Sequence, residues 1–595
     1  MSRHLRIFAL FLMLFAALPL RGQWSVSADA AFGYGQMKAL DEDDSPLRHG
    51  LGEGGFRIGH KSKRFQWNTA VRGSYENRDS DVNRVTLTGL STDEAPTKLD
   101  AMFQKGENDR GAGSVRTEMK WAPSPARTYD AWLQYGFQVD DVDYGTFKIG
   151  GDIGEEDDME NSSLNLYIEN SRTVEQRAIA GISTSQQIDG SRKVLLALLS
   201  FEDLNRDKEN EWLKMDVSDA EMTGGVFRLT PRTDSRMVSG IIHFTDSIRT
   251  AKNVRLMIDP GLRVFSNHAL DHNRGATLVD GEVWRDSTRL REDFNFLALR
   301  IEPYFAADMT WNKLRVHLDY APQMYSRRLT DDTHKQKLKS RPVHPVGNGL
   351  ISWTFSPNHK LTLLNRLEVR HPDYIQICWY ERQGAFLNQI YRGKESLRSI
   401  RTMTFNLDYG YTYMRFNANT AVSYTRNYNE IDQTYNNEVI EGRQYQVFTW
   451  VNASHSHSTA ISGRLGWRGR MLTANAGASY NGTRRTSSQT RESKLSKDWR
   501  AWADASLSLP HGWSMSVNAN YRSDRATFFT VFKSYCTLNA RIQKRFGKVN
   551  VFIQGRDLLD NTLEREYTSS DFNETWVEST RNNRRLLMLG MNYGL

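Results

Sequence analysis

Apolar and polar residues alternate along much of the chain, and the pattern is clearest at its end. Over the last nine residues every second position is apolar, and these positions are Leu587, Leu589, Met591, Tyr593 and Leu595. The positions between them are mostly small or polar. A period of two predicts a β-strand with one face against an apolar medium and the other against water.

The residues from Trp24 to Gly35 show the same alternation, with Trp24, Val26 and Phe32 on the apolar face. We predict that this first strand pairs with the last one and closes a barrel, because lipid offers no partner to an open strand edge. The residues expected at this closure are Trp24, Val26, Leu589, Met591, Tyr593 and Leu595.

Short turns rich in Pro, Gly and Asn separate several pairs of alternating segments. They predict four hairpins, formed by residues 115–121 with 129–137, 350–355 with 361–369, 403–411 with 416–424, and 502–509 with 513–521. Long polar stretches lie between such hairpins, at 38–52, 76–113, 140–161, 203–223, 325–346, 426–443 and 483–498. Short turns on one side and long polar loops on the other are typical of outer-membrane barrels, whose long loops face outside.

A strand that crosses a bilayer within a barrel needs about 9–11 residues. The fold class that we predict is therefore all-β, a transmembrane antiparallel β-barrel of about 18–22 strands with long extracellular loops. A barrel of about 14–16 strands with longer loops also fits the length of the chain. A soluble array of β-sandwiches would not explain why the aromatic-rich alternation continues to the last residue.

Residues 1–22 have the organisation of a secretory signal peptide. Arg3 and Arg6 precede an apolar run from Ile7 to Leu20, and the small residue Gly22 follows. We expect cleavage between Gly22 and Gln23, which leaves one barrel over residues 23–595. The apolar run is too short for a helix that spans a membrane.

The bulk composition excludes two other classes of protein. The mean hydropathy of −0.61 and the lack of a later uniformly apolar segment exclude helical membrane spans. Loss of the three arginines of the signal peptide lowers the formal charge from +8 to +5. These charges are spread out, so we expect no nucleic-acid partner. The expected surroundings are the lipid and lipopolysaccharide of a Gram-negative outer membrane.

The segment Leu538–Asn561 resembles the penultimate hairpin of the barrels of TonB-dependent receptors, with a basic-Phe pair, a tight turn, a strand and an Asp-Leu-Leu-Asp turn. Two further stretches are similar to that family as found in Bacteroidota. They are His371–Tyr374 with Leu387-Asn388 and Gly393–Leu397, and Leu509–Trp513 before Tyr521. The resemblance covers about residues 345–595 and implies a barrel of that family.

Family members place a plug domain and an energy-coupling box ahead of the first strand, whereas the strand pattern here begins at Trp24. We therefore expect a barrel without a plug domain, and two functions follow. The first is a subunit or scaffold of an outer-membrane assembly, secretion or surface-lipoprotein complex, with protein partners at the extracellular loops or in the lumen. The alternative is a passive channel or transporter for solutes.

Candidate chemistry is sparse, and we expect neither an enzyme nor a bound cofactor. His455 and His457 point to the same face of a strand and could ligate a metal, but no third ligand is near them in sequence. Ser454, His455 and Ser456 have no visible activating partner for a catalytic role. Arg116, Lys120 and Arg415 are expected to face the lumen. Cys378 and Cys536 either form one bridge or remain two thiols.

Overall fold

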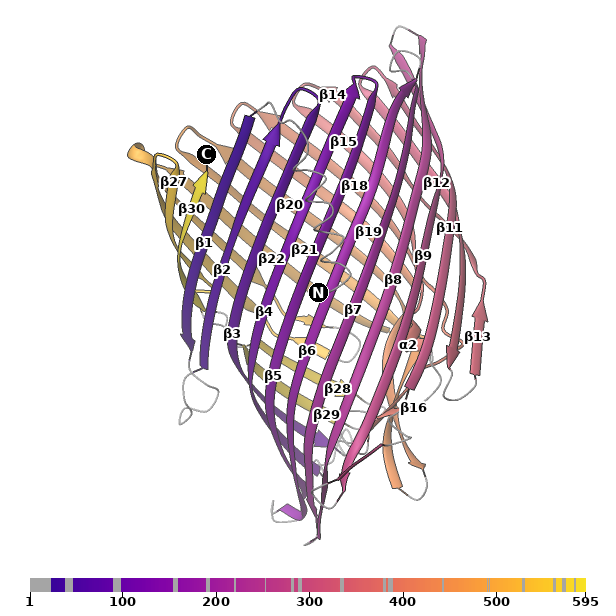
Figure 1. Ribbon diagram of the computed structural model, residues 1–595, viewed down its shortest axis with the longest axis vertical. Coiled ribbons are helices and arrows are strands. Elements are labelled where there is room, and N and C mark those ends of the chain that lie inside the picture. The colour runs from indigo at the N-terminus through magenta and orange to yellow at the C-terminus, as the bar shows by residue number, and fades with distance from the viewer. Residues whose placement is uncertain are drawn as a thin grey trace.

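A computed structural model shows an all-β protein in which one sheet closes on itself as a tall, tilted barrel (Figure 1). The described residues are 23–37, 47–88, 98–153, 159–188, 193–218, 221–251, 253–279, 283–286, 292–331, 336–377, 381–383, 389–440, 443–488, 491, 493–526, 530–559, 563–569, 574–582 and 585–594. Within these ranges no helix is long and apolar enough to cross a membrane.

Among the described residues, 22 strands form the ring, and each is antiparallel to both of its neighbours. In order around the barrel they are β1 (Gln23–Met37), β2 (Leu47–Lys61), β3 (Phe65–Thr88), β4 (Lys98–Ser124), β5 (Arg127–Ile153), β6 (Met159–Ile188), β7 (Lys193–Ser218), β8 (Glu221–Ala251), β9 (Val254–Val279), β11 (Glu292–Trp311), β12 (Leu314–Asp331), β14 (Val343–Ser356), β15 (His359–Arg370), β18 (Ile400–Tyr413), β19 (Phe416–Ile440), β20 (Arg443–Arg468), β21 (Leu472–Ser487), β22 (Ser493–Ser508), β23 (Trp513–Arg522), β26 (Tyr535–Phe546), β27 (Val549–Arg556) and β30 (Leu586–Gly594).

Ten shorter elements of the described ranges are not part of the ring of 22 strands. They are β10 (Val283–Asp286), β13 (Gln336–Ser340), β16 (Glu381–Gln383), β17 (Gln389–Arg392), β24 (Arg525–Ala526), β25 (Thr530–Phe532), β28 (Leu563–Ser569), β29 (Glu574–Asn582), the single helical turn α2 (Tyr374–Ile377) and the 3-10 turn η2 (Pro510–Gly512). The predicted transmembrane antiparallel barrel is confirmed, and the number of strands is at the upper end of the predicted range. The four predicted hairpins are β4–β5, β14–β15, β18–β19 and β22–β23.

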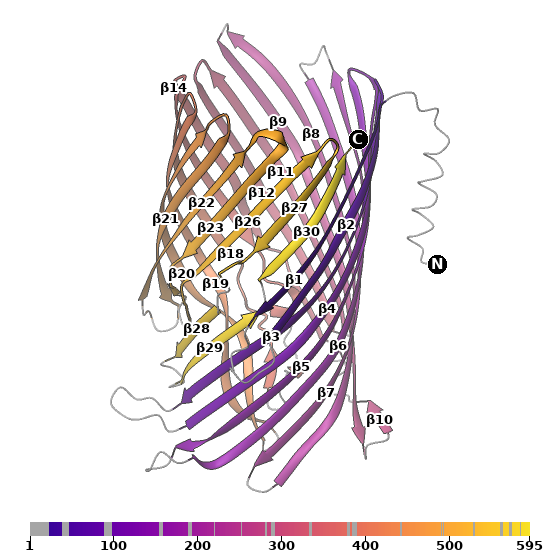
Figure 2. The same cartoon turned by 90° about the vertical axis from the view of Figure 1, so that its left-hand side faces the viewer.

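The barrel is closed by its first and last strands, β1 and β30, which lie side by side in Figure 2. Their register runs from Ser27 opposite Gly594 to Tyr34 opposite Leu587, and it places Leu589 opposite Phe32. Trp24 and Val26 precede this paired stretch and lie opposite β2, and residue 595 lies outside the described residues. Ala31, Phe552, Leu586 and Met588 form a small apolar cluster on the inner side of this closing seam.

The long polar stretches are mostly strand rather than loop, which corrects the prediction of long extracellular loops. Of the stretch 76–113, for example, all but residues 89–97 belong to β3 and β4. Strands β3 to β9 have 24–31 residues, more than twice what a bilayer crossing needs. Beyond the bilayer both faces of a strand are in water, so the apolar alternation that identifies a strand is lost there.

The taller wall over β3–β7 is visible in Figure 2. Its lower edge in this view continues into the hairpin β28–β29, because β29 pairs with Ser80–Thr88 of β3 and β28 pairs with β25. The end of the barrel that carries these extensions is called the long-strand end, and the opposite end, with the tight turns, is called the short-turn end.

Candidate functional site in the barrel lumen

The two faces of the wall differ in chemistry, and this difference identifies the lumen. On β12, Leu318 and Tyr320 are about 60% exposed and belong to an apolar outer belt. His317 and Asp319 alternate with them and point the other way, toward polar partners on neighbouring strands. A barrel in lipid has its apolar face outside, so the polar face lines the lumen.

The described residues between β15 and β18, which are 371–377, 381–383 and 389–399, fold into the lumen, and we call them the inward segment. Its Ile377 and Leu397 are buried in an apolar cluster whose other members come from lumenal positions of β9, β11, β12 and β13. Those members are Ala269, Phe294, Phe296, Ala298, Leu329 and Leu338. The ring of Phe296 also lies 5.5 Å from that of Tyr374. Burial of this apolar surface holds the inward segment against one side of the lumen.

Polar contacts fix where the inward segment begins. The Nε2 of His371 lies 2.7 Å from the Oε1 of Gln323, and the Nε2 of Gln323 donates to Glu302 at 2.6 Å. Because Gln323 Oε1 is therefore an acceptor, His371 donates through Nε2, and its Nδ1 accepts from the Ser399 hydroxyl at 2.9 Å. Burial, with smaller contributions from His344, Arg327 and Arg300, lowers the pKa of His371 to about 3. The imidazole is thus neutral at physiological pH.

Further contacts attach the rest of the inward segment to the wall. The Tyr374 hydroxyl donates to Asp271 Oδ2 at 3.1 Å, which joins α2 to β9. Asn452 of β20 bonds both the backbone N–H and the carbonyl of Arg398, at 2.9 and 3.1 Å. Strand β17 runs parallel to β20, and Tyr391 stacks on Phe448 with ring centroids 5.0 Å apart. These contacts fix the inward segment to the wall, so it forms an ordered part of the lumen lining.

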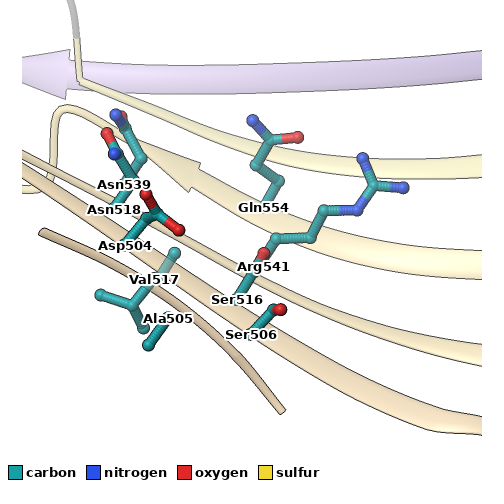
Figure 3. A pocket seen from close by; sticks show the side chains of 10 residues that line it. Asp504, Ala505, Ser506, Ser516, Val517, Asn518, Asn539, Arg541 and Gln554 are labelled. Atoms are coloured by element: carbon teal, nitrogen blue, oxygen red, sulfur yellow. The ribbon is translucent and has the colours of Figure 1, made fainter. Parts of the chain in front are cut away.

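An open groove of about 310 Å³ lies away from the inward segment, on β22, β23, β26 and β27 (Figure 3). Asp504, Asn518 and Asn539 gather at one end of it, and Arg541 and Gln554 lie at the other. The guanidinium of Arg541 lies 3.7 Å from the centre of the Phe552 ring, and its Nε has no hydrogen-bond partner. The groove therefore combines amide groups, a carboxylate and an incompletely paired cation.

A second polar groove, of about 510 Å³, lies beside the closing seam. Its charged lining includes His49, Glu76, Arg78, Arg110 and Arg556. His49 and Glu76 are in direct contact, with Nε2 and Oε1 2.9 Å apart. Both grooves face the lumen, where they can hold polar solutes and water.

The structure separates the residues that the sequence had grouped for chemistry. His455 and His457 project from the outer face of β20, where the hydroxyl of Tyr424 lies 2.7 Å from His457 Nδ1. Ser454 and Ser456 point into the lumen instead, and both donate to Glu430, at 2.9 and 2.7 Å. Alternation along one strand thus places the histidines and the serines on opposite sides of the wall. The described part of the chain contains no group of three or more potential metal ligands.

Two of the three cations that we predicted to face the lumen do so. Arg116 and Lys120 lie on the lumenal face of β4 and pair with Glu118 and Asp130. Arg415 lies in the tight turn between β18 and β19. Cys378 and the cleavage residue Gly22 lie outside the described residues, so neither the cysteine pairing nor the cleavage site is tested. The sequence analysis did not predict the inward segment. The apolar residues Ile377 and Leu397 within an otherwise polar connection were a signal for it.

The C-terminal part of the chain, residues 328–593, matches the profile of the outer membrane protein beta-barrel family. None of the curated protein sequences compared with the chain matches it. Three solved structures of similar fold are the siderophore receptor PirA from Pseudomonas aeruginosa, the ferric citrate transporter FecA and the FrpB iron transporter from Neisseria meningitidis. Their TM-scores are 0.56, 0.64 and 0.58, and their sequence identities are 9%, 10% and 11%.

Each comparison covers 97% of this chain, and it covers 81% of PirA, 79% of FecA and 83% of FrpB. At such identities the likeness concerns the fold alone. That fold is the barrel fold of these outer-membrane proteins.

Proposed function

We propose that this protein, a β-barrel of the outer membrane with the architecture of TonB-dependent receptors, binds solutes in its lumen and transports them across the membrane. The observation that carries the proposal is the arrangement of the lumen. One side is occupied by the inward segment, while open grooves with polar side chains remain on β22–β27 and at the closing seam.

The size of the ring supports this role. Barrels of 16–18 strands already leave an aqueous channel, and a ring of 22 is wider. A segment that folds inward narrows such a lumen and gives it side chains that contact a solute. The names of the three similar structures, a siderophore receptor and two transporters of iron or ferric citrate, also support transport. The scaffold role that we predicted first has no comparable support.

The apolar outer belt supports a further part of the proposal, which is direct contact with outer-membrane lipid and lipopolysaccharide. Trp353 and Leu318, for example, are exposed on this belt. Large exposed apolar side chains of this kind are stable only in contact with lipid or with another apolar surface.

The experiment that tests transport uses the full chain, reconstituted in planar bilayers and in liposomes. We expect discrete currents and size-dependent uptake of sugars by the liposomes. The variant Ile377→Asp places a charge in the apolar cluster, where an unpaired carboxylate is strongly unfavourable. It should release the inward segment and raise both signals several-fold.

The matched control is Ser396→Asp, which adds the same charge at an exposed position of the same segment. It should leave conductance and uptake close to those of the wild type. If the folded wild type and Ile377→Asp both lack conductance and sugar uptake, the transport proposal is wrong. Stable co-purification of partner chains with such a silent barrel would favour the scaffold role instead.

A further inference from the structure

Two pairs of cations lie directly opposite each other on neighbouring strands of the lumenal wall. Arg485 of β21 lies opposite Lys494 of β22, and Arg500 of β22 lies opposite Arg522 of β23. Their outward neighbours, such as Trp499 and Tyr521, are exposed on the outer face, so these cations point inward. Like charges directly opposite each other in a sheet destabilise it.

A fourth arginine, Arg525, adds to this group from the connection that follows β23. Its neighbour Ala526 accepts a bond from Arg485 Nη1 at 3.3 Å and donates its backbone N–H to Ser496 Oγ at 3.1 Å. The guanidinium of Arg525 lies 4.5 Å from the centre of the Phe532 ring. We call Arg485, Arg500, Arg522 and Arg525 the lumenal arginine cluster.

Carboxylates compensate this cluster only in part. In the described part of the chain, Asp498 is the one carboxylate within 4 Å of any of its four guanidinium groups, at 3.8 Å from Arg500 Nε. Asp498 also accepts a bond from Asn481 at 3.0 Å. Two nitrogen atoms of Arg522, Nε and Nη2, are buried and have no hydrogen-bond partner. The Nε of Arg525 is also buried and has no hydrogen-bond partner.

Several arginines elsewhere in the lumen are neutralised by carboxylates, although Arg327 and Arg541 also have nitrogen atoms without a hydrogen-bond partner. Arg177 pairs with Glu202 at 2.7 Å, and Arg206 pairs with Glu175 at 2.5 Å. The cluster differs from these paired arginines because its four positive charges are only partly compensated, by Asp498 beside Arg500 and by Asp432, whose charge interacts with that of Arg485. Burial and the charges of Arg522, Arg500 and Arg485 lower the pKa of Arg525, although an arginine remains protonated in proteins. Repulsion among cations held this close together favours the binding of an anion between them.

We propose that the lumenal arginine cluster binds anionic solutes that carry carboxylate or phosphate groups. The planar guanidinium group matches the geometry of both oxyanions and binds them through two parallel hydrogen bonds. Because the cluster points into the lumen, its ligand is a solute and not a lipid of the surrounding membrane. The proposal rests on the proposed transport function for its biological meaning, since it names the class of substrate.

The strands that carry the cluster also carry the groove of Figure 3. On β22, Asp504 follows Arg500 by four residues on the same face, and on β23 Asn518 precedes Arg522 by four. The groove lies nearer the short-turn end and contains Arg541, whose Nε has no partner. A solute that leaves the cluster toward the short-turn end therefore meets another cation on the same wall.

The test measures binding to the purified full chain in detergent by titration calorimetry at low salt. The probes are inorganic pyrophosphate and the tricarboxylate tricarballylate, and the tighter binder identifies the preferred oxyanion. We expect the double variant Arg522→Gln/Arg525→Gln to bind the preferred probe at least tenfold more weakly than the wild type. Because it also relieves repulsion, this variant should resist urea better than the wild type when no anion is present.

The matched control is Arg484→Gln/Lys497→Gln, which removes two cations from the outer face of the same strands β21 and β22. It should bind the probes within twofold of the wild type. No binding of either probe to the folded wild type, or equal binding by the cluster variant, overturns the proposal. Binding is measured without transport, so a silent barrel that binds anions contradicts the proposed function and not this inference.

Discussion

The imidazole of His371 lies flat on the ring of Tyr325, with ring centroids 3.7 Å apart and an interplanar angle of 5°. Tyr325 belongs to the lumenal face of β12, and His371 is the first residue after β15. Together with the bond from His371 Nε2 to Gln323, this stack joins the start of the inward segment to the wall. The state of one buried imidazole therefore affects how firmly the segment is held.

The first prediction concerns acid pH. The pKa of His371 is about 3 in the folded protein and about 6.5 in an unfolded chain, so the unfolded segment binds the proton more readily. The contribution of His371 is complete above about pH 6.5 and is lost as the pH falls toward 3. At about pH 4.5, we expect hydrogen exchange of residues 371–377, corrected for its intrinsic pH dependence, to be faster by up to roughly 100-fold.

The variant His371→Gln should lose most of this pH dependence. His359→Gln, at the opposite end of β15, removes a histidine whose ring bonds the Tyr409 hydroxyl, and it should keep the dependence of the wild type. Equal exchange of the wild-type segment at pH 7 and pH 4.5 would contradict the assignment.

The second prediction concerns the apolar cluster under the inward segment. Phe296→Ala removes a side chain that is 5% exposed and should destabilise the packing of the segment by about 3–4 kcal/mol. We expect the segment to become accessible to protease and the conductance to rise. The adjacent Leu297 faces outward and is 43% exposed, so Leu297→Ala should leave both unchanged. Equal effects of the two substitutions would exclude a specific role for the cluster.

The third prediction concerns the hairpin β28–β29 at the long-strand end. Glu578 of β29 is 2% exposed and accepts bonds from Arg84 of β3 at 3.0 Å and from Arg565 of β28 at 2.6 Å. Burial opposes its charge, but the bonds and charges of the two arginines outweigh burial and lower the pKa of Glu578. Its contribution is thus present above about pH 4.5 and is lost at lower pH.

Glu578→Gln should destabilise this hairpin by roughly 2–3 kcal/mol, because it leaves a buried position without the charge that both arginines require. Hydrogen exchange of residues 574–582 measures the effect. Glu118→Gln removes the exposed partner of Arg116 and should change stability by less than about 0.5 kcal/mol. Unchanged protection of residues 574–582 in Glu578→Gln would refute the role of the ion pairs.

The fourth prediction concerns the closing seam. A Cβ on Gly35 of β1 would lie 1.6 Å from the backbone carbonyl oxygen of Arg585, so one of the two strands must shift. Gly35→Ala should therefore lower the free energy of unfolding by about 1–3 kcal/mol, measured by urea titration of the folded band in cold SDS gels. Gly50→Ala on β2 meets no atom within 4 Å and should stay within about 0.5 kcal/mol of the wild type.

The sequence by itself determined the wall of this protein. Lipid accepts only fully paired strands and demands an apolar side chain at every second position, so Phe32 and Leu589 already indicated which faces point outward and which strands meet. The height of the wall could not be predicted from the sequence. Strands such as β7 continue beyond the bilayer into water, where apolar and polar side chains need not alternate.

Only the tertiary structure decided the content of the lumen. Ile377 is buried by residues of β9, β11, β12 and β13, and the opposition of Arg500 and Arg522 depends on the register of β22 and β23. Such contacts join segments far apart along the chain, and their partners are selected by packing and charge rather than by a local period. A polar lumen accepts many sequences, so the same residues become informative only once their neighbours are known.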